Sequence, residues 1–280
     1  KPFVFKIIDG LIRAHGHDVK SYHIAIQLLS KTNLDFNTQL QIYNLILKHG
    51  KPYWVLDQKN PEHYVINLST YCNLKLLYTL SKADYLGRIS NDNINNIEYF
   101  KEYAKDLNCY NKPYNFKSNI TKYKYLNEDS CWKDDKLYDD TKSKVILLSG
   151  LPASGKDNYI KKLNYNVISL DEIRRKLKIK PTQNQGKVIQ KAKEESKKFL
   201  RKGENFIWNA TNITRSTRKK LIDLFTDYNA YVEIHYIHCD YETILKRNNK
   251  RENKVPEKII NKLLKKLDIP VPNECHKIKY

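Results

Sequence analysis

The chain has 280 residues and a formal net charge of +20, with 40% hydrophobic and 29% charged residues. This length suggests about two domains, each able to bury a core, and no stretch reaches the roughly 20 apolar residues of a membrane span. The five cysteines form no CxxC pair, which argues against a disulfide framework or a cysteine metal site and favours a cytoplasmic protein with reduced thiols.

The positive charge is unevenly distributed along the chain. Residues 1–143 contain 20 Lys and Arg against 16 Asp and Glu, and residues 144–280 contain 31 against 15, giving net charges of +4 and +16. A compact half with that excess attracts polyanions such as nucleic acids. The alternative is that the lysines reflect composition only and keep the protein soluble.

Residues 1–118 are expected to form an all-helical domain. Segments such as "YHIAIQLLSK" and "TQLQIYNLILKHG" place apolar residues at i, i+3 and i+4, the spacing of a helix with one buried face. Residues 119–143 are polar, charged and without a period, which predicts a linker.

From residue 144 the pattern changes to alternating strands and helices. Short apolar runs, "KVILLSG", "NVISLD", "NFIWNAT" and "AYVEIHYIHCD", predict four strands. Helical patterns over 156–163, 172–178, 186–202 and 214–227 separate them. The alternation predicts an α/β domain over 144–280, with a parallel sheet flanked by helices on both faces. Ligands bind such sheets beyond the carboxyl ends of the strands.

The first of these strands leads into the sequence "SGLPASGKD", which fits the phosphate-binding pattern G-x-x-x-x-G-K-[ST] except at its last position. Backbone N–H groups of such a loop hold the phosphates of a nucleotide, and the lysine reaches the β- and γ-phosphates. The alternative is a glycine-containing turn with an exposed lysine. The residues expected to bind the nucleotide are Gly150, Pro152, Ser154, Gly155, Lys156 and Asp157.

Asp157 stands where the pattern has a Ser or Thr that binds Mg²⁺. The third strand ends at Asn209, where a carboxylate for the metal is often found, so a carboxylate is gained at one place and absent at another. Because Mg²⁺ prefers oxygen ligands, we expect Asp157 to hold Mg²⁺ directly or through water. The competing hypothesis is that Asp157 only stabilises the N-terminus of the following helix.

The second strand ends in "SLDEIRR", which places Asp171 at the mouth of the sheet and Arg174 one helical turn later. A carboxylate there could accept the proton of an attacking hydroxyl, and the arginine could bind an acceptor phosphate. The alternative is that Asp171 caps a helix and Arg174 is solvated.

Together, "SGLPASGKD", "SLDEIRR", "WNATNITR" and "ETILKRNNKRENKVPEKIINKLLKKL" resemble the 5′-OH polynucleotide kinases of phage and bacterial nucleic-acid repair. The resemblance covers 144 to about 270 and implies a P-loop kinase with a helical lid. It implies that Lys156 binds ATP phosphates, Asp171 is the general base and Arg174 contacts the acceptor, while Arg247 and Arg251 lie in the lid over the donor. We count Lys156, Asp171, Arg174 and Arg251 as catalytic. Further substrate contacts are expected from Asn212, Arg215 and Arg218.

The N-terminal segments "HGHDVKSYHIA", "LILKHGKPY" and "LSKADYLGR" resemble the later part of HD phosphohydrolase domains. By this resemblance His17, His49 and Asp84 are metal ligands, for Mn²⁺, Ni²⁺, Co²⁺ or Zn²⁺. Imidazole and carboxylate suit a metal that activates water. The family's His-Asp pair is expected before Lys1, so the domain is predicted to be incomplete at its N-terminus. The alternative is three unrelated helical residues.

The sequence therefore predicts a kinase that uses ATP, or another NTP, with Mg²⁺ to phosphorylate the 5′-OH end of RNA or DNA. The HD-type domain would process 2′,3′-cyclic or 2′-phosphate ends, and a nucleic-acid ligase is an expected partner. An oligomer is compatible with the sequence. Two alternatives stay open: a small-molecule kinase of the nucleotide-sugar kinase toxin type, and a non-catalytic nucleic-acid-binding NTPase module.

Overall fold

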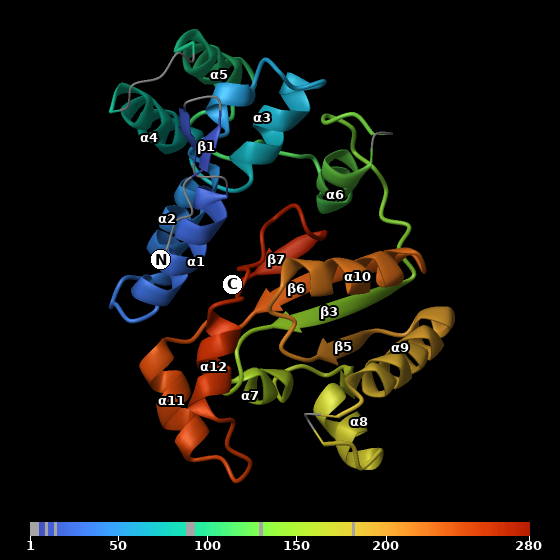
Figure 1. Cartoon of the computed structure of the whole chain (residues 1–280). Coiled ribbons are helices and arrows are strands. Elements are labelled where there is room, and N and C mark those ends of the chain that lie inside the picture. Colours follow the sequence, from blue (N-terminus) through green and yellow to red (C-terminus); the bar gives the residue numbers. More distant parts are fainter. Residues whose placement is uncertain (1–5, 9–10, 14–15, 88–92, 129–130, 181–182) are drawn as a thin grey trace. The chain divides into compact units, whose positions relative to one another are not determined.

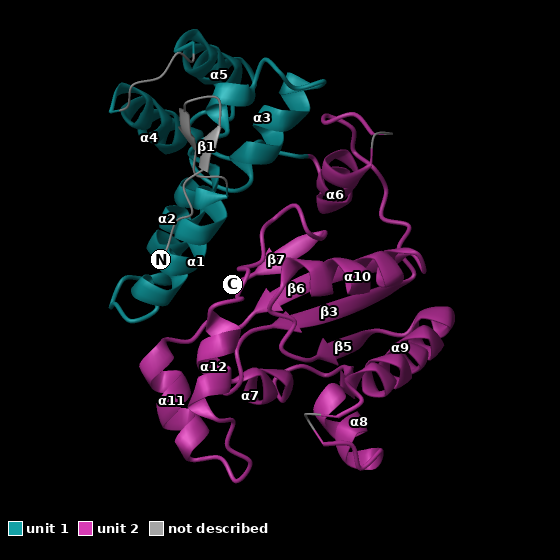
Figure 2. Ribbon diagram, in the orientation of Figure 1, with its two compact units in different colours: residues 1–116 teal, residues 117–280 magenta. Residues whose placement is uncertain are grey.

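The computed structural model describes residues 6–8, 11–13, 16–87, 93–128, 131–180 and 183–280. It contains two compact units, an N-terminal unit of residues 1–116 and a C-terminal unit of residues 117–280 (Figure 2). Across the described residues, every helix is too short or too polar to cross a membrane.

The N-terminal unit is mainly helical, as its apolar periodicity predicts. Its helices are α1 (His17–Leu29), α2 (Phe36–Lys48), η1 (Pro52–Trp54), α3 (Pro61–Ser69), α4 (Leu74–Leu86) and α5 (Asn95–Asp106). Asp35, Asn60 and Asn73 cap α2, α3 and α4 by accepting hydrogen bonds from backbone N–H groups.

One feature of this unit differs from the prediction. Strands β1 (Lys6–Ile8) and β2 (Leu11–Arg13) form an antiparallel pair with Ile7 opposite Ile12. The helical periodicity of the later segments does not extend to these strands, so the prediction of an all-helical domain is wrong here.

The C-terminal unit contains a five-stranded sheet, in which all strands are parallel, with helices on both faces (Figure 1). The strand order is β4-β5-β3-β6-β7. The strands are β3 (Ser143–Ser149), β4 (Asn166–Ser169), β5 (Phe206–Asn209), β6 (Ala230–Tyr236) and β7 (Lys277–Lys279). The helices are α6 (Asn119–Asn127), α7 (Lys156–Ile160), α8 (Leu170–Lys176), α9 (Gln185–Lys202), α10 (Arg215–Thr226), α11 (Tyr241–Asn249) and α12 (Glu257–Leu264).

Alternating residues of the strands build two cores. Val145 and Leu147 face the larger core with residues of α8, α9 and α10, whereas Ile146 and Leu148 face a smaller one beside Tyr159 of α7. Burial on both faces explains why the strands are continuous apolar runs. The prediction of a parallel sheet flanked by helices is confirmed, and β7 adds a fifth strand that was not predicted.

The segment expected to be a linker, 119–143, lies within the C-terminal unit. Ser118 caps α6, and Tyr123 of α6 belongs to the larger core, where its ring stacks on His276 with centroids 4.3 Å apart. Because its buried residues mix two aliphatic side chains with a threonine and two tyrosines, this helix shows no clear apolar period in the sequence. The physical boundary therefore precedes α6.

Candidate functional site

The phosphate-binding loop lies between β3 and α7, at the carboxyl end of the central strand. Two of its glycines are required by geometry: Gly150 has a φ of 152° and Gly155 a φ of 108°. A Cβ atom at Gly150 would lie 2.8 Å from the carbonyl oxygen of Ile237, closer than real contacts allow. The loop therefore has the tight backbone that a phosphate cradle needs, and Ser154 is buried within it.

The Lys156 amine is held at this loop. Its Nζ donates to the carbonyl oxygens of Gly150 at 2.8 Å and Leu151 at 2.7 Å. The pKa of Lys156 is lowered to about 8, mainly by burial and also by the positive charge of Arg251, while the carboxylates of Asp157 and Asp171 oppose the shift. These four groups, taken from three separate sequence motifs, therefore lie close enough to interact electrostatically.

Asp157 and Asn209 are brought into direct contact. The Asn209 side chain, at the end of β5, donates from Nδ2 to Oδ1 of Asp157 at 3.1 Å. The N-cap of α7 is Gly155, with no side-chain cap, so Asp157 does not cap the helix by a hydrogen bond. The carboxylate and the Asn209 amide oxygen are ligands of the type that Mg²⁺ prefers, and Mg²⁺ sites commonly use one or two carboxylates with substrate phosphates. These residues fit a nucleotide-bound Mg²⁺, which would neutralise phosphate charge.

Asp171 and Arg174 form an ion pair on α8, as their spacing predicts. Arg174 Nε also donates to Oε1 of Gln185 on α9 at 2.7 Å, which fixes the guanidinium between two helices. The alternative that Asp171 caps α8 is wrong, because the cap is Ser169, whose Oγ accepts from Glu172 N. Asp171 stays 77% exposed and open to a substrate.

The two lid arginines have different positions: Arg247 contacts the phosphate loop, and Arg251 lies near enough to act on the charge of Lys156. Arg247 of α11 donates from Nη1 to the Ser154 carbonyl oxygen at 3.0 Å, so the lid helix bears on the phosphate loop. Arg251 follows the end of α11. The sequence did not single out Asn248, whose side chain holds the loop between α11 and α12. Its amide donates to the Val255 carbonyl oxygen at 2.8 Å and accepts from the Val255 N–H at 3.0 Å.

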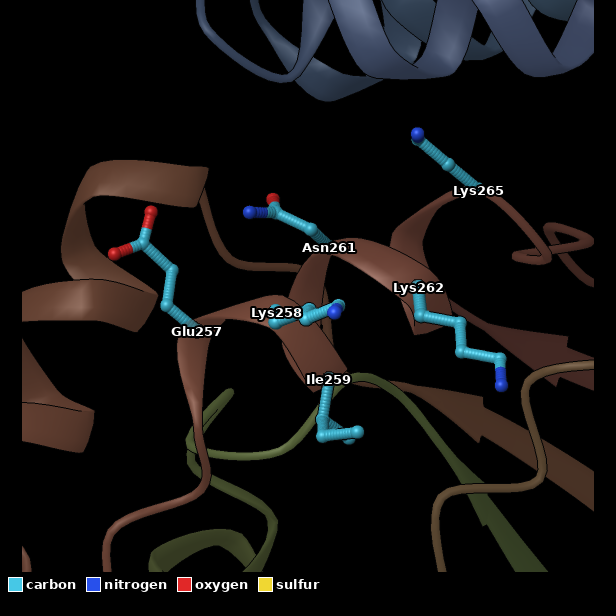
Figure 3. A pocket seen from close by; sticks show the side chains of 6 residues that line it. All are labelled: Glu257, Lys258, Ile259, Asn261, Lys262 and Lys265. Carbon is cyan, nitrogen blue, oxygen red and sulfur yellow. The ribbon is translucent and has the colours of Figure 1, made fainter.

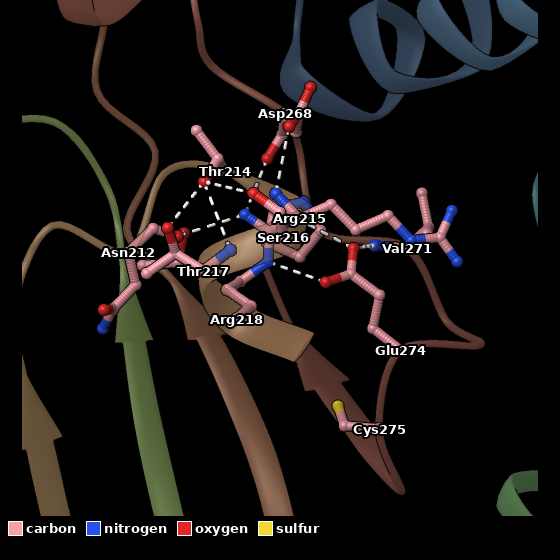
Figure 4. A network of polar contacts seen from close by, with 12 residues as sticks. Asn212, Thr214, Arg215, Ser216, Thr217, Arg218, Asp268, Val271, Glu274 and Cys275 are labelled. Carbon is pink, nitrogen blue, oxygen red and sulfur yellow. Dashed lines mark hydrogen bonds and ion pairs between the residues drawn. The ribbon is translucent and has the colours of Figure 1, made fainter. Parts of the chain in front are cut away.

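Two of the three further substrate residues belong to the framework instead (Figure 4). Arg218 is completely buried and pairs with both oxygens of Glu274, from Nε at 2.7 Å and from Nη2 at 2.9 Å. Its Nη1 donates to the carbonyl oxygens of Asn212 and Asp268. A guanidinium enclosed in this way has no access to a substrate, and we correct its assignment.

Asn212 is also structural. Its side chain donates to the Leu148 carbonyl oxygen at 2.7 Å, directly before the phosphate loop, and its own carbonyl oxygen accepts from Ser149 Oγ. Its φ of 42° is in the left-handed region, which asparagine tolerates. Asn212 thus supports the loop from beneath. Arg215 is exposed, donates to Asn273 Oδ1 at 3.2 Å, and remains a candidate for substrate contact.

In the N-terminal unit, His17 and His49 meet with their Nε2 atoms 3.0 Å apart. His49 Nδ1 lies 2.7 Å from the Ile46 carbonyl oxygen, to which it must donate, leaving Nε2 of a neutral ring as an acceptor. Asp84 Oδ2 accepts from Tyr53 OH at 3.1 Å. Over the residues that the structure describes, no group of three His, Cys, Asp or Glu side chains could hold a metal ion. The expected three-ligand metal site is therefore not formed by these side chains.

Comparisons with known proteins bear on the C-terminal unit. Residues 145–270, just under half of the chain, match the family model of an AAA domain. The C-terminal unit thus combines a phosphate-binding loop with a stretch that is similar to an AAA domain. Its loop and parallel sheet are those of a nucleotide-binding fold, and the match does not extend to the N-terminal unit. The polynucleotide-kinase and HD resemblances stay predictions.

Fifty-one chains of solved structures match. One is a gluconokinase from Sinorhizobium meliloti 1021, 16% identical, aligned over 50% of this chain and 82% of that chain with a TM-score of 0.35. No curated protein matches the chain.

The contact between Asp157 and Asn209 leads to a first prediction. Asp157→Ala should raise the Mg²⁺ concentration for half-maximal nucleotide turnover by about 10-fold or more, the cost of losing a metal-site partner. Asp157→Ser should be tolerated because a hydroxyl also binds Mg²⁺. Magnesium titrations of the rate measure this, with the exposed neighbour Asn158→Ala as control. An unchanged Mg²⁺ curve, with a loss of about 1 kcal/mol in unfolding free energy, would leave Asp157 a helix-stabilising residue.

Proposed function

We propose that the C-terminal unit transfers the γ-phosphoryl group of ATP, or another NTP, to the 5′-hydroxyl of a polynucleotide. The observation that carries this proposal is the convergence at the phosphate loop of the Lys156 amine, the Asp157–Asn209 contact and the lid residue Arg247, with the charges of Asp171 and Arg251 acting on Lys156. A donor cradle, an acceptor-side carboxylate and a lid cation are the parts that phosphoryl transfer requires, because its transition state is stabilised by positioning and charge.

In this reaction the acceptor oxygen bonds to the γ-phosphorus while the bond to the β–γ bridging oxygen breaks and the nucleoside diphosphate leaves. Lys156 and the loop hold the donor phosphates, and the bound Mg²⁺ would neutralise charge on them. Asp171 takes the proton of the hydroxyl. Arg174, fixed by Gln185, binds the phosphate that follows the acceptor nucleotide.

The choice of a polynucleotide acceptor rests on the net charge of +16 over residues 144–280. A small-molecule acceptor would need only the few cations at the loop and lid. The two are separated by transfer of label from γ-³²P ATP to 5′-OH RNA and DNA oligomers, with 5′-phosphorylated oligomers, nucleosides and sugars as controls. Labelling of a sugar or nucleoside alone would replace the proposal by a small-molecule kinase. Oligomer binding without transfer to any acceptor would indicate a non-catalytic module.

Asp171 gives the sharpest test of the acceptor side. Asp171→Asn should lower kcat by about 10²-fold or more, because it removes the general base, while the KM for ATP changes little. Glu172→Gln is the matched control: it neutralises the next carboxylate of the same helix, also exposed. Initial rates at saturating ATP measure both. Turnover near that of the unaltered protein in Asp171→Asn would remove Asp171 as the base.

A second candidate function, phosphoester hydrolysis by the N-terminal unit, is favoured by the contact between His17 and His49. Because the described residues do not complete a metal site, we derive no hydrolytic step from it. If the two imidazoles are metal ligands, the chain should bind Mn²⁺ or Ni²⁺, and His49→Ala should weaken binding by about 10-fold or more. Calorimetric titration measures this, with His63→Ala, at a half-buried histidine of α3, as comparison variant. Equal affinity in all three proteins would make the pair a structural contact.

A further inference from the structure

The positive charge of the C-terminal half is concentrated in one run. Residues 173–193 contain eight Lys and Arg and no Asp or Glu. This run therefore carries half of the net +16 of residues 144–280, within 21 positions. Such a block cannot neutralise itself, so any compensation must come from elsewhere in the fold or from a bound anion.

The structure places this run beside the acceptor side of the candidate site. It begins in α8, which starts where β4 ends, and reaches the first half of α9, whose buried residues pack against the sheet; the two helices lie side by side (Figure 1). The bond from Arg174 to Gln185 joins them. The six exposed cations of the run are Arg175, Lys176, Lys178, Lys180, Lys187 and Lys191.

These cations are not compensated by neighbouring carboxylates. In the described part of the chain, Arg174 is the run's one cation in an ion pair, with Asp171. By contrast, two cations on neighbouring helical surfaces of the unit do pair with carboxylates: Lys219 with Asp223, and Lys197 with Glu194. Lys187 and Lys191 are four residues apart and so share one face of α9.

We infer that α8 and the first half of α9 form a track for the phosphodiester backbone of a single-stranded polynucleotide. The strand enters at its 5′-hydroxyl beside Asp171, and its following phosphates lie along Lys176, Lys187 and Lys191. This inference rests on the proposed function and specifies where its acceptor binds. Regularly repeated phosphates match a row of uncompensated lysines, whereas a small-molecule acceptor would end at Arg174.

A second basic surface provides a matched comparison. Lys258 and Lys262 of α12 and Lys265, which follows its end, line a shallow depression with Glu257 and neighbouring residues (Figure 3). This surface includes a carboxylate and follows the lid rather than the acceptor-side helix. It has the same number of exposed lysines as the track positions chosen above, so substituting it changes the net charge equally.

The experiment compares two triple variants of the full chain. One is Lys176→Gln/Lys187→Gln/Lys191→Gln, and the other is Lys258→Gln/Lys262→Gln/Lys265→Gln. Binding of a 5′-OH 12-nucleotide single strand is followed by fluorescence anisotropy across salt concentrations, without nucleotide. Losing three phosphate contacts should lower the slope of log affinity against log salt by about 2, at roughly 0.7 per contact, and weaken binding on the order of 10-fold or more at 0.15 M salt.

We expect this loss in the α8–α9 variant only, with an unchanged KM for ATP and unchanged phosphorylation of a nucleoside 3′-phosphate, which is too short to reach the track. Unchanged oligomer binding in that variant, or an equal loss in the α12 variant, overturns the track. If the unaltered protein binds the oligomer through the track but phosphorylates no acceptor, the proposed function fails while the binding surface stands. If the unaltered protein phosphorylates oligomers and the α8–α9 variant binds them normally, the proposed function stands while the track fails.

Discussion

Arg218→Met should lower the free energy of unfolding of the C-terminal unit by about 3–5 kcal/mol, the range found when one partner of a buried ion pair is removed. The side chains of Arg218 and Glu274 are 0% and 3% exposed, so the variant leaves a carboxylate in the core. Of the donors that reach Glu274, the Val271 N–H at 3.0 Å would remain. Urea unfolding followed by tryptophan fluorescence measures the loss, because Trp208 is buried in this unit.

Two further variants make this result interpretable. Lys219→Met removes the adjacent residue's ion pair with Asp223, which is exposed at 72% and 50%, and should cost at most about 1 kcal/mol. Arg218→Met/Glu274→Met should recover much of the stability, since an apolar pair can replace a buried ion pair. A stable Arg218→Met protein that had lost only acceptor affinity would restore the substrate role that the sequence suggested.

The four strands β3 to β6 could be predicted because each is a short apolar run between helical patterns, and burial on both faces leaves that mark on the sequence. The edge strand β7 could not, because Lys277-Ile278-Lys279 has one apolar residue and pairs only with β6. Helix α6 was missed for a related reason: its buried face mixes tyrosines and a threonine with two aliphatic residues and so has no clear apolar period.

In the candidate site, too, features set by neighbouring residues could be predicted, and features set by residues far apart in the sequence could not. The phosphate loop follows β3, and the pair Asp171–Arg174 follows β4. Each depends on short spacings within a single strand–helix junction, and these spacings are visible in the sequence. The role of Arg218 depends on Glu274, which lies 56 residues away. An exposed and a buried arginine look alike in a sequence, so the correct interpretation required the fold.

The contact between Asp157 and Asn209 lies between these two cases. The sequence showed that a carboxylate was gained in the loop and that one was absent after the third strand. That the two positions touch follows from strand order, because β5 lies beside β3 and their carboxyl ends therefore meet. Parallel topology thus turned two separate observations into one candidate metal site.

Arg251→Ala should lower kcat for phosphoryl transfer by roughly 10³-fold, the loss associated with an arginine that stabilises charge on the transferred group. Arg251 follows α11 and lies near enough to Lys156 that its charge lowers the pKa of that amine. Arg247, one turn earlier, already contacts the loop through Ser154, so the lid is positioned to place Arg251 over the donor. Single-turnover rates at saturating ATP measure the chemical step.

The pH dependence of ATP binding separates this role from a loss of nucleic-acid affinity. Because phosphates prefer the protonated amine, ATP binding should weaken as the pH rises through about 8, the pKa of Lys156. Removing Arg251 removes a charge that lowers this pKa, so the fall should move to higher pH in Arg251→Ala. Arg251→Lys should keep the unaltered profile, since it retains the charge, but recover only part of kcat, since it loses the planar guanidinium. An Arg251→Ala protein with normal kcat and normal pH profile, but a shallower salt dependence of oligomer binding, would place Arg251 on the polynucleotide backbone instead.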